Sequence, residues 1–126
     1  MQVALVSPER ILYEGEADMV IARTAGGDIA FLNNHAPFVG VLGIGKVRIT
    51  PAGAGSGSNE IVAAVHGGFV EVKDNRVTIL SDVAELADQI DVARAREALT
   101  RTGGDDEDAA LARRRAEVRL EAAGAS

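Results

Sequence analysis

Short apolar runs separated by turn residues fill residues 26–49, and this spacing favours strands over helices. Gly26 and Gly27 can adopt positive φ, which is typical of a tight turn. Residues 28–32 then predict a short strand. The Asn-Asn-His-Ala-Pro segment at residues 33–37 ends it, because asparagine tolerates left-handed backbone and the residue before a proline is disfavoured in a helix. Residues 46–49 alternate polar and apolar side chains, the pattern of a half-buried strand.

Two polar side chains mark the ends of this apolar strand. Asp28 lies at its start and His35 follows its end, while residues 29–32 of the strand are apolar. One carboxylate and one imidazole at separate ends of an apolar strand do not resemble a catalytic cleft. We therefore interpret the strand as a docking edge for another protein surface.

The same alternation of apolar runs and turns continues to about residue 85. It predicts about eight or nine short strands with turn chemistry between them, the sign of an antiparallel sandwich or barrel. Asp74-Asn75 is a hairpin signal between two alternating runs. No helix-length amphipathic segment interrupts the strands, so a fold of alternating strands and helices is not expected.

Composition limits both the core and the partners of this chain. Of its 126 residues 47% are hydrophobic and only 3% aromatic, so the core should consist of Val, Ile, Leu and Ala. The net charge of −6 argues against a nucleic-acid partner, which needs a basic surface. The absence of cysteine excludes disulfides and zinc–thiolate sites. No apolar run reaches the roughly 18 residues of a membrane span, so we expect no direct membrane insertion.

The periodicity changes from strand to helix beyond residue 82. Asp91 is a good helix N-cap ahead of a helix over residues 91–101, in which Val92, Ala95 and Leu99 recur at helical spacing. Gly103-Gly104 should end this helix, and a second helix should cover residues 109–123. The fold class is thus mainly β plus small α. A sandwich domain occupies residues 1–86 and a two-helix hairpin residues 87–126.

The second helix has a thin apolar face. We expect this face to consist of Leu111 and Val118, seven residues apart, together with Ala112 and Ala116. Such a face buries little area, so we expect the hairpin to dock only marginally on the sandwich and to be able to move.

Several motifs that suggest an enzyme fail on inspection. Residues 40–46 have the spacing of a phosphate-binding loop, but Val47 stands where Ser or Thr is needed and a strand, not a helix, should follow. His35 and His66 have no second ligand at metal-binding spacing, so no metal site is expected, and His66 fits a structural residue at a strand end. No serine lies in a nucleophile context. The chain is not expected to be an enzyme in its own right.

An arginine-rich second helix suggests an anion site. Arg115 and Arg119 are four residues apart and share a helix face. Together with Arg94 and Asp91 at the start of the first helix, three guanidinium groups could converge on one anionic ligand. The alternative is an ordinary solvated face on which these arginines pair with neighbouring glutamates.

Three sequence blocks, taken together in order and spacing, resemble the ε subunit of bacterial F-type ATP synthase. The first comprises residues 13–17 with residues 28–37, the second residues 65–72 with residues 75–82, and the third residues 84–95. The similarity covers essentially residues 3–100. The shortened, acid-rich C-terminal part resembles that of actinobacterial members.

The resemblance implies a β-sandwich of about ten strands followed by a two-helix domain. It implies a non-catalytic rotor subunit of the central stalk that couples proton translocation to ATP synthesis. The implied partners are the γ subunit, the ring of c subunits and the αβ catalytic head, at the cytoplasmic face of the bacterial cell membrane. The family's contact loop corresponds here to Asp28, His35, Pro37 and Phe38.

The resemblance also implies regulation of ATP hydrolysis by the helices. Some family members bind ATP through a motif matched here by Ile90, Asp91, Arg94 and Ala95, with Glu85 upstream. Arg115 and Arg119 are the candidate partners from the second helix. No cofactor is required, and the shortened hairpin implies that ATP binding is weak.

Two alternatives belong to other classes of protein. A free-standing nucleotide-sensing module would bind ATP at micromolar concentration without any affinity for γ. A small β-sandwich enzyme would need a polar cleft, which the sequence does not display.

Overall fold

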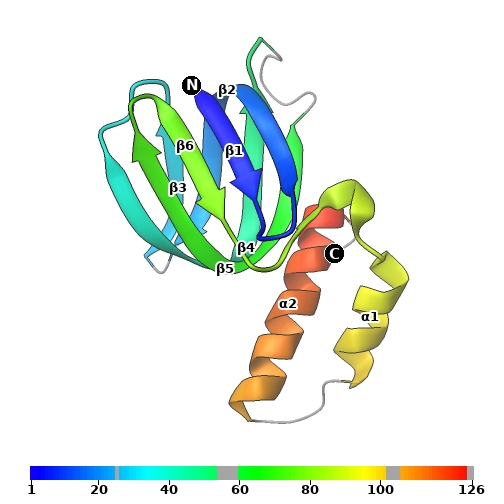
Figure 1. The fold of residues 1–126 in the computed structure, drawn as a ribbon. Coiled ribbons are helices and arrows are strands. Elements are labelled where there is room, and N and C mark those ends of the chain that lie inside the picture. Colours follow the sequence, from blue (N-terminus) through cyan, green and yellow to red (C-terminus); the bar gives the residue numbers. More distant parts are fainter. Residues whose placement is uncertain (25, 54–59, 102–105, 125–126) are drawn as a thin grey trace.

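The computed structural model describes residues 1–24, 26–53, 60–101 and 106–124. Among them it contains seven strands, one short 3₁₀ helix and two α-helices (Figure 1). The strands are β1 (Gln2–Val6), β2 (Ile11–Thr24), β3 (Gly27–Leu32), β4 (Phe38–Pro51), β5 (Ile61–Lys73), β6 (Arg76–Leu80) and β7 (Ala84–Leu86). The helices are η1 (Ala87–Gln89), α1 (Val92–Arg101) and α2 (Glu107–Ala123). The predicted fold, a β-sandwich followed by a two-helix hairpin, is confirmed.

The strands form a closed ring of ladders. Their order is β1-β6-β5-β4-β2, and β1 also pairs with β2, which closes the ring. β3 extends β2 at one edge, and β7 pairs with β5. The described ladders are antiparallel except that between β1 and β6, which is parallel. The predicted docking strand, β3, is therefore an edge strand.

Three long strands replace several of the short ones that the sequence predicts. β2, β4 and β5 contain 13 or 14 residues and run through internal glycines, a residue type that is typical of turns. In β4 the glycine serves packing, because a Cβ on Gly45 would lie 2.5 Å from the Cβ of Arg23. In β5 the pair Gly67-Gly68 adopts φ of +86° and +134°, so the strand bends there without ending.

The core of the sandwich is aliphatic, as the composition predicts. Its fully buried side chains are almost all Val, Leu and Ile, and Phe31 is the aromatic among them. The Asp74-Asn75 signal also holds, since both residues have positive φ (53° and 58°) between β5 and β6, as a tight hairpin turn requires.

The hairpin projects from one end of the sandwich, and the C-terminal part of α2 lies against it (Figure 1). Asp106 caps α2 by accepting a hydrogen bond of 2.7 Å from the N–H of Ala109. The predicted glycine turn at residues 103–104 lies outside the described residues. Val118 and Ala122 of α2 pack with Ala64 of β5 in a second apolar cluster, separate from the sandwich core.

The apolar face of α2 differs in part from the one predicted. Ala116 and Val118 are buried as expected, and Leu120 is buried as well. Leu111 is 39% exposed, since it lies in the half of the helix that projects away from the sandwich. How strongly the hairpin docks stays a prediction.

Candidate functional site

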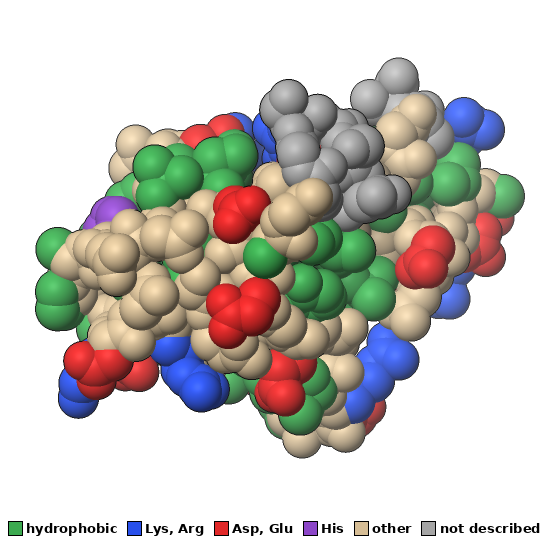
Figure 2. Space-filling view, turned by 90° about the horizontal axis from the view of Figure 1, so that it is seen from above, with side chains coloured by type: hydrophobic (Ala, Val, Ile, Leu, Met, Phe, Trp, Pro, Cys, Tyr) green, Lys and Arg blue, Asp and Glu red, His purple; other side chains and the backbone are tan. Residues whose placement is uncertain are grey.

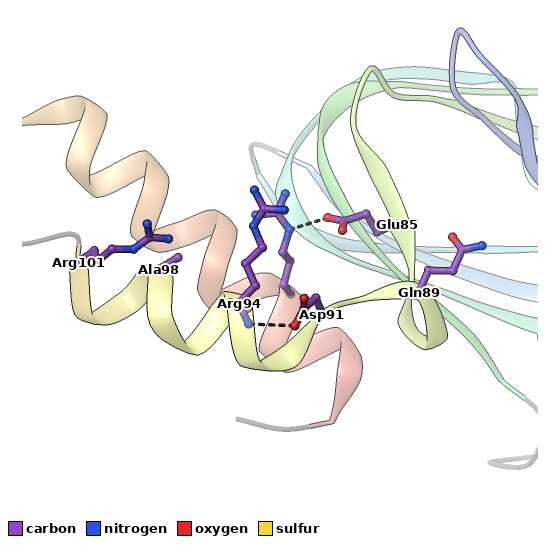
Figure 3. A pocket seen from close by; sticks show the side chains of 8 residues that line it. Glu85, Gln89, Asp91, Arg94, Ala98 and Arg101 are labelled. Carbon is purple, nitrogen blue, oxygen red and sulfur yellow. Dashed lines mark hydrogen bonds and ion pairs between the residues drawn. The ribbon is translucent and has the colours of Figure 1, made fainter.

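A cleft of about 480 Å³ opens where the hairpin meets the sandwich (Figure 3). Strand β7, helix η1 and both α-helices contribute to its wall. The lining residues are Glu85, Gln89, Asp91, Arg94, Ala95, Ala98, Arg101 and Arg119. Its volume lies within the usual range of small-molecule sites, roughly 300–1,000 Å³.

The segment from Ile90 to Ala95 builds one side of this cleft. Ile90 has extended backbone and anchors the segment in the apolar cluster under α2. Asp91 then starts α1, since its Oδ1 accepts a hydrogen bond of 3.0 Å from the backbone N–H of Arg94. The predicted N-cap is confirmed. Arg94 consequently lies in the first turn of α1 and lines the cleft, whereas Ala95 is only 3% exposed.

An ion pair connects the hairpin to the sandwich across the cleft. Nε of Arg119 donates to Oε1 of Glu85 over 2.5 Å, and each side chain is about 30% exposed (29% and 30%). Arg101, at the other end of α1, lies 3.8 Å from Glu97. The side chain of Arg94 has no ion-pair partner among the described residues (Figure 3).

The charges of the cleft suit an anionic ligand. Arg94, Arg101 and Arg119 face only two lining carboxylates, Glu85 and Asp91, so the lining carries a net positive charge. Guanidinium groups donate two hydrogen bonds at a time to phosphate or carboxylate oxygens. In a chain of net charge −6 this local excess stands out. The charge and the donor groups of the cleft match the oxygens of a phosphorylated small molecule.

The structure brings most of the predicted anion site together and leaves two residues outside. Glu85, Asp91, Arg94, Ala95 and Arg119 line one cleft. Ile90 lies in the apolar cluster instead, where it serves as an anchor.

Arg115 is exposed and does not line the cleft. Sequence reasoning missed Gln89, Ala98 and Arg101. Helical spacing from Arg94 could have found the last two, which follow it by four and seven residues on one face of α1.

His66 lies beside this cleft, within β5 and not at a strand end as the sequence suggested. Its side chain is 2% exposed, and its Nε2 lies 3.4 Å from Oε1 of Glu85. Burial lowers the pKa of His66 below its ordinary value, and the positive charge of Arg119 lowers that pKa further. This environment depends on the docked α2 and is not apparent from the residues around His66 in the chain.

The predicted contact loop separates into two places. Asp28, at the start of β3, accepts a hydrogen bond of 2.8 Å from Nε of Arg23. His35 and Phe38 lie beyond the other end of β3 and contact the buried ring of Phe31, with ring centroids 5.1 Å and 5.6 Å from it.

Pro37 lies exposed between His35 and Phe38. The N–H of His35 donates to the carbonyl oxygen of Leu32, so His35 lies at the opposite end of β3 from Asp28. They flank the edge strand without forming one cluster.

A row of exposed apolar side chains crosses the sandwich. Val41 of β4 is the register partner of Phe69 of β5, and Phe69 is the partner of Leu80 of β6. These three side chains are 60%, 58% and 51% exposed. Apolar groups also appear between acidic and basic ones in the view from above (Figure 2). Contiguous exposed apolar residues of this kind mark protein interaction sites.

No helix in the described part of the chain is long and apolar enough to cross a membrane. Within the same residues no group of three or more His, Asp or Glu side chains could hold a metal ion.

The sequence matches the family model described as "ATP synthase, Delta/Epsilon chain, beta-sandwich domain" over residues 1–87. It is 47% identical over 125 residues to the ATP synthase epsilon chain of Streptomyces coelicolor, covering 98% of this chain and 94% of that one. It is 51% identical over 98 residues to that of Thermobifida fusca, covering 77% and 70% of the two chains.

Solved structures with the same fold come from mitochondrial ATP synthases. A chain of the Euglena gracilis OSCP/F1/c-ring structure matches with a TM-score of 0.65 at 22% identity, covering 98% of this chain and 76% of that one. A chain of the Tetrahymena thermophila central stalk/c-ring structure matches with a TM-score of 0.63 at 19% identity, covering 98% and 96%. The sandwich, the two-helix hairpin and the 47% identity over nearly the whole chain lead to the same conclusion. This chain belongs to the ATP synthase epsilon-chain family.

Proposed function

We propose that this chain is the ε subunit of a bacterial F-type ATP synthase, a non-catalytic part of its central stalk. The relatives are epsilon chains, and the structural neighbours come from assemblies of F1, central stalk and c-ring. The subunit rotates with the stalk and couples proton translocation to ATP synthesis. It lies at the cytoplasmic face of the cell membrane and is held there by its partners.

The observation that carries this proposal is the exposed apolar row of Val41, Phe69 and Leu80 on an otherwise closed sandwich. Solvent exposure of three large apolar side chains on adjacent strands is unfavourable unless a partner covers them. We assign this row to the γ subunit.

The contact with the c-ring is assigned to the edge strand β3 and the loop that follows it. There the side chains of His35 and Phe38 are held against Phe31, and Pro37 is exposed. Asp28 at the other end of β3 supplies a carboxylate, with Arg23 beside it.

The two parts of the chain have different roles in this proposal. Residues 1–86 form the rigid body that binds γ and the c-ring, and residues 87–126 form the regulatory hairpin. Released from the sandwich, the hairpin can reach the αβ head and slow ATP hydrolysis. A regulatory element needs two states that differ by only a few kcal/mol, and the small apolar cluster around Val118 supports such a balance.

The cleft between the hairpin and the sandwich is proposed as a weak ATP site that favours the docked hairpin. Arg94 and Arg101 are placed to bind phosphate oxygens. Arg119 is already engaged with Glu85 at 2.5 Å, and Arg115 lies outside the cleft. Two of the expected guanidinium groups are therefore not free for the ligand, which supports weak binding.

The test uses the catalytic head of a bacterial ATP synthase depleted of its ε subunit. Three full-length chains are compared for binding and for their effect on ATP hydrolysis: the wild type, Phe69→Asp and Val118→Asp. We expect the wild type to bind and Phe69→Asp to bind at least tenfold more weakly. Val118→Asp should bind through its intact sandwich and inhibit more strongly, because its hairpin is released.

Each result has a defined meaning. Leu111→Asp, on the projecting half of α2, serves as the matched control for Val118→Asp and should behave like the wild type. If Phe69→Asp binds as well as the wild type, the apolar row is not the γ surface. If Val118→Asp and the wild type inhibit equally, the hairpin does not regulate hydrolysis.

The second candidate is a free-standing nucleotide sensor, favoured by the positively charged cleft alone. Calorimetry of the isolated chain with ATP distinguishes it. Micromolar binding together with no affinity for the head supports the sensor, whereas millimolar binding with affinity for the head supports the stalk subunit.

A further inference from the structure

His66 occupies the interface between the sandwich and the hairpin. Side chains alternate between the two faces of β5, so His66 shares its face with Ala64 and Val62, whereas Val65 points into the sandwich core. Ala64 belongs to the apolar cluster that contains Val118 of α2. The imidazole therefore lies on the surface that the docked hairpin covers, and its side chain is 2% exposed.

The imidazole of His66 has no hydrogen-bond partner among the described residues. Both Nδ1 and Nε2 are buried. Nε2 lies 3.4 Å from Oε1 of Glu85, close enough for electrostatic attraction but not aligned as a hydrogen bond. Buried polar groups without partners are rare in folded proteins, and each one calls for an explanation.

The charged groups that face His66 come from two elements. Among the described residues Glu85 of β7 is the single carboxylate, and its Oε1 already accepts a hydrogen bond from Arg119 of α2. Arg119 and Arg115, both on α2, lower the pKa of His66 through their positive charge, whereas Glu85 raises it. The neighbouring strand β4 contributes Ile44, the register partner of His66, which has no ionisable group.

We infer that protonation of the His66 imidazole, which lies beside the Glu85–Arg119 ion pair, releases α2 from the sandwich. A proton on His66 adds a third positive charge beside Arg119 and Arg115, and it makes His66 compete with Arg119 for the one carboxylate of Glu85. Undocking of α2 relieves both effects, because it removes the two arginines and exposes the imidazole to water.

The direction of the pH dependence follows from the two states. In the docked state burial and the arginines hold the pKa of His66 below its ordinary value. In the undocked state the pKa returns towards about 6.5. Protons therefore bind preferentially to the undocked state. Docking is fully stable above about pH 6.5 and weakens as the pH falls below it, by up to roughly tenfold in the equilibrium constant per pH unit.

This inference relies on the proposed mobility of the hairpin but not on nucleotide binding. Its test therefore uses the full chain without ATP and without the synthase. If the cleft does not bind ATP, the result of this test is unchanged. If docking of α2 does not depend on pH, the proposal that the chain is a stalk subunit is unaffected.

NMR spectroscopy of the full chain measures the protonation of His66 and the docking of α2 in one titration from pH 8 to pH 5. The sequence contains only two histidines, so the imidazole signals of His66 and His35 are readily assigned. Nuclear Overhauser contacts between the methyl groups of Val118 and those of Ala64 and Val62 report docking. We expect these contacts to disappear as His66 gains its proton, while the sandwich stays folded.

Two substitutions at His66 separate titration from packing. His66→Asn keeps a polar side chain that does not titrate, and His66→Leu fills the site with an apolar one. Both should keep the docking contacts down to pH 5. His35→Asn, at the other end of the sandwich, is the control and should release α2 at the same pH as the wild type.

Several results would overturn the inference. One is a wild type that keeps its docking contacts at pH 5, and another is a substituted chain that releases α2 at the wild-type midpoint. If both substituted chains are undocked at every pH, the wild-type chain alone tests the inference. Release of α2 in that chain must then coincide with the titration of His66.

Discussion

Arg119 and Glu85, 34 residues apart in the chain, are joined by a hydrogen bond of 2.5 Å between Nε and Oε1. This pair connects α2 directly to β7 at the edge of the candidate cleft. Glu85→Ala should weaken docking of the hairpin by about 1 kcal/mol, the upper range for a partly exposed pair. Hydrogen exchange of the α2 amides measures the change. Glu97→Ala, which removes the exposed partner of Arg101, is the control, and equal protection in both variants would contradict the prediction.

Val118 of α2 is fully buried and packs in the apolar cluster with Ala64. Val118→Ala removes two methyl groups from the cluster with Ala64 and should weaken docking by about 2 kcal/mol. Thermal unfolding followed by methyl NMR should show the hairpin releasing earlier while the sandwich melts as before. Leu111→Ala removes more apolar atoms from an exposed site and should change little. Comparable losses in the two variants would argue against docking through Val118.

Asp91 has two separable roles, as a helix cap and as a charge in the cleft. Asp91→Asn keeps an oxygen that can accept from the N–H of Arg94, so α1 should stay intact. Asp91→Ala should destabilise α1 by about 1 kcal/mol. Circular dichroism measures the helix content, and calorimetry measures the affinity of the cleft for ATP. A loss of helix in Asp91→Asn equal to that in Asp91→Ala would show that the cap is not the relevant contact.

Gly68 is required by the geometry of β5. Its φ is +134°, and a Cβ there would lie 2.0 Å from the carbonyl oxygen of Leu80, which is backbone and cannot move aside. Gly68→Ala should therefore destabilise the sandwich by at least about 3 kcal/mol. Gly43→Ala on β4, where the nearest atom is 4.0 Å from the added Cβ, is the matched control. Denaturant unfolding compares the two, and similar midpoints would contradict the prediction.

Local chemistry was sufficient to predict several features from the sequence. The positive φ at Asp74 and Asn75 and the cap at Asp91 both depend on neighbours within a few residues. The aliphatic core follows from the scarcity of aromatic residues. The number of strands could not be predicted from local sequence. Gly45 looks like a break between strands, but it allows the close approach of Arg23 from another strand.

Features that depend on tertiary contacts were out of reach. Arg115 and Arg119 are equivalent by helical spacing, yet only Arg119 meets Glu85 and lines the cleft. The difference depends on where α2 crosses the sandwich, which the spacing of its residues does not specify. His66 likewise looked like an ordinary strand residue, because its burial depends on a helix about 50 residues further along the chain.

The β4–β5 ladder carries both surfaces on which the proposed functions depend. Val41 pairs with Phe69 in the exposed apolar row, and three residues along the same strand Ile44 pairs with His66 beneath α2. The two surfaces are therefore only about 10 Å apart, at the rise of a strand. A partner that changes the twist of this ladder at Phe69 also changes the surface on which α2 docks. In the proposed function, binding of γ at Phe69 and release of the hairpin would then be thermodynamically linked, and by reciprocity a released hairpin would alter the affinity for γ by the same factor.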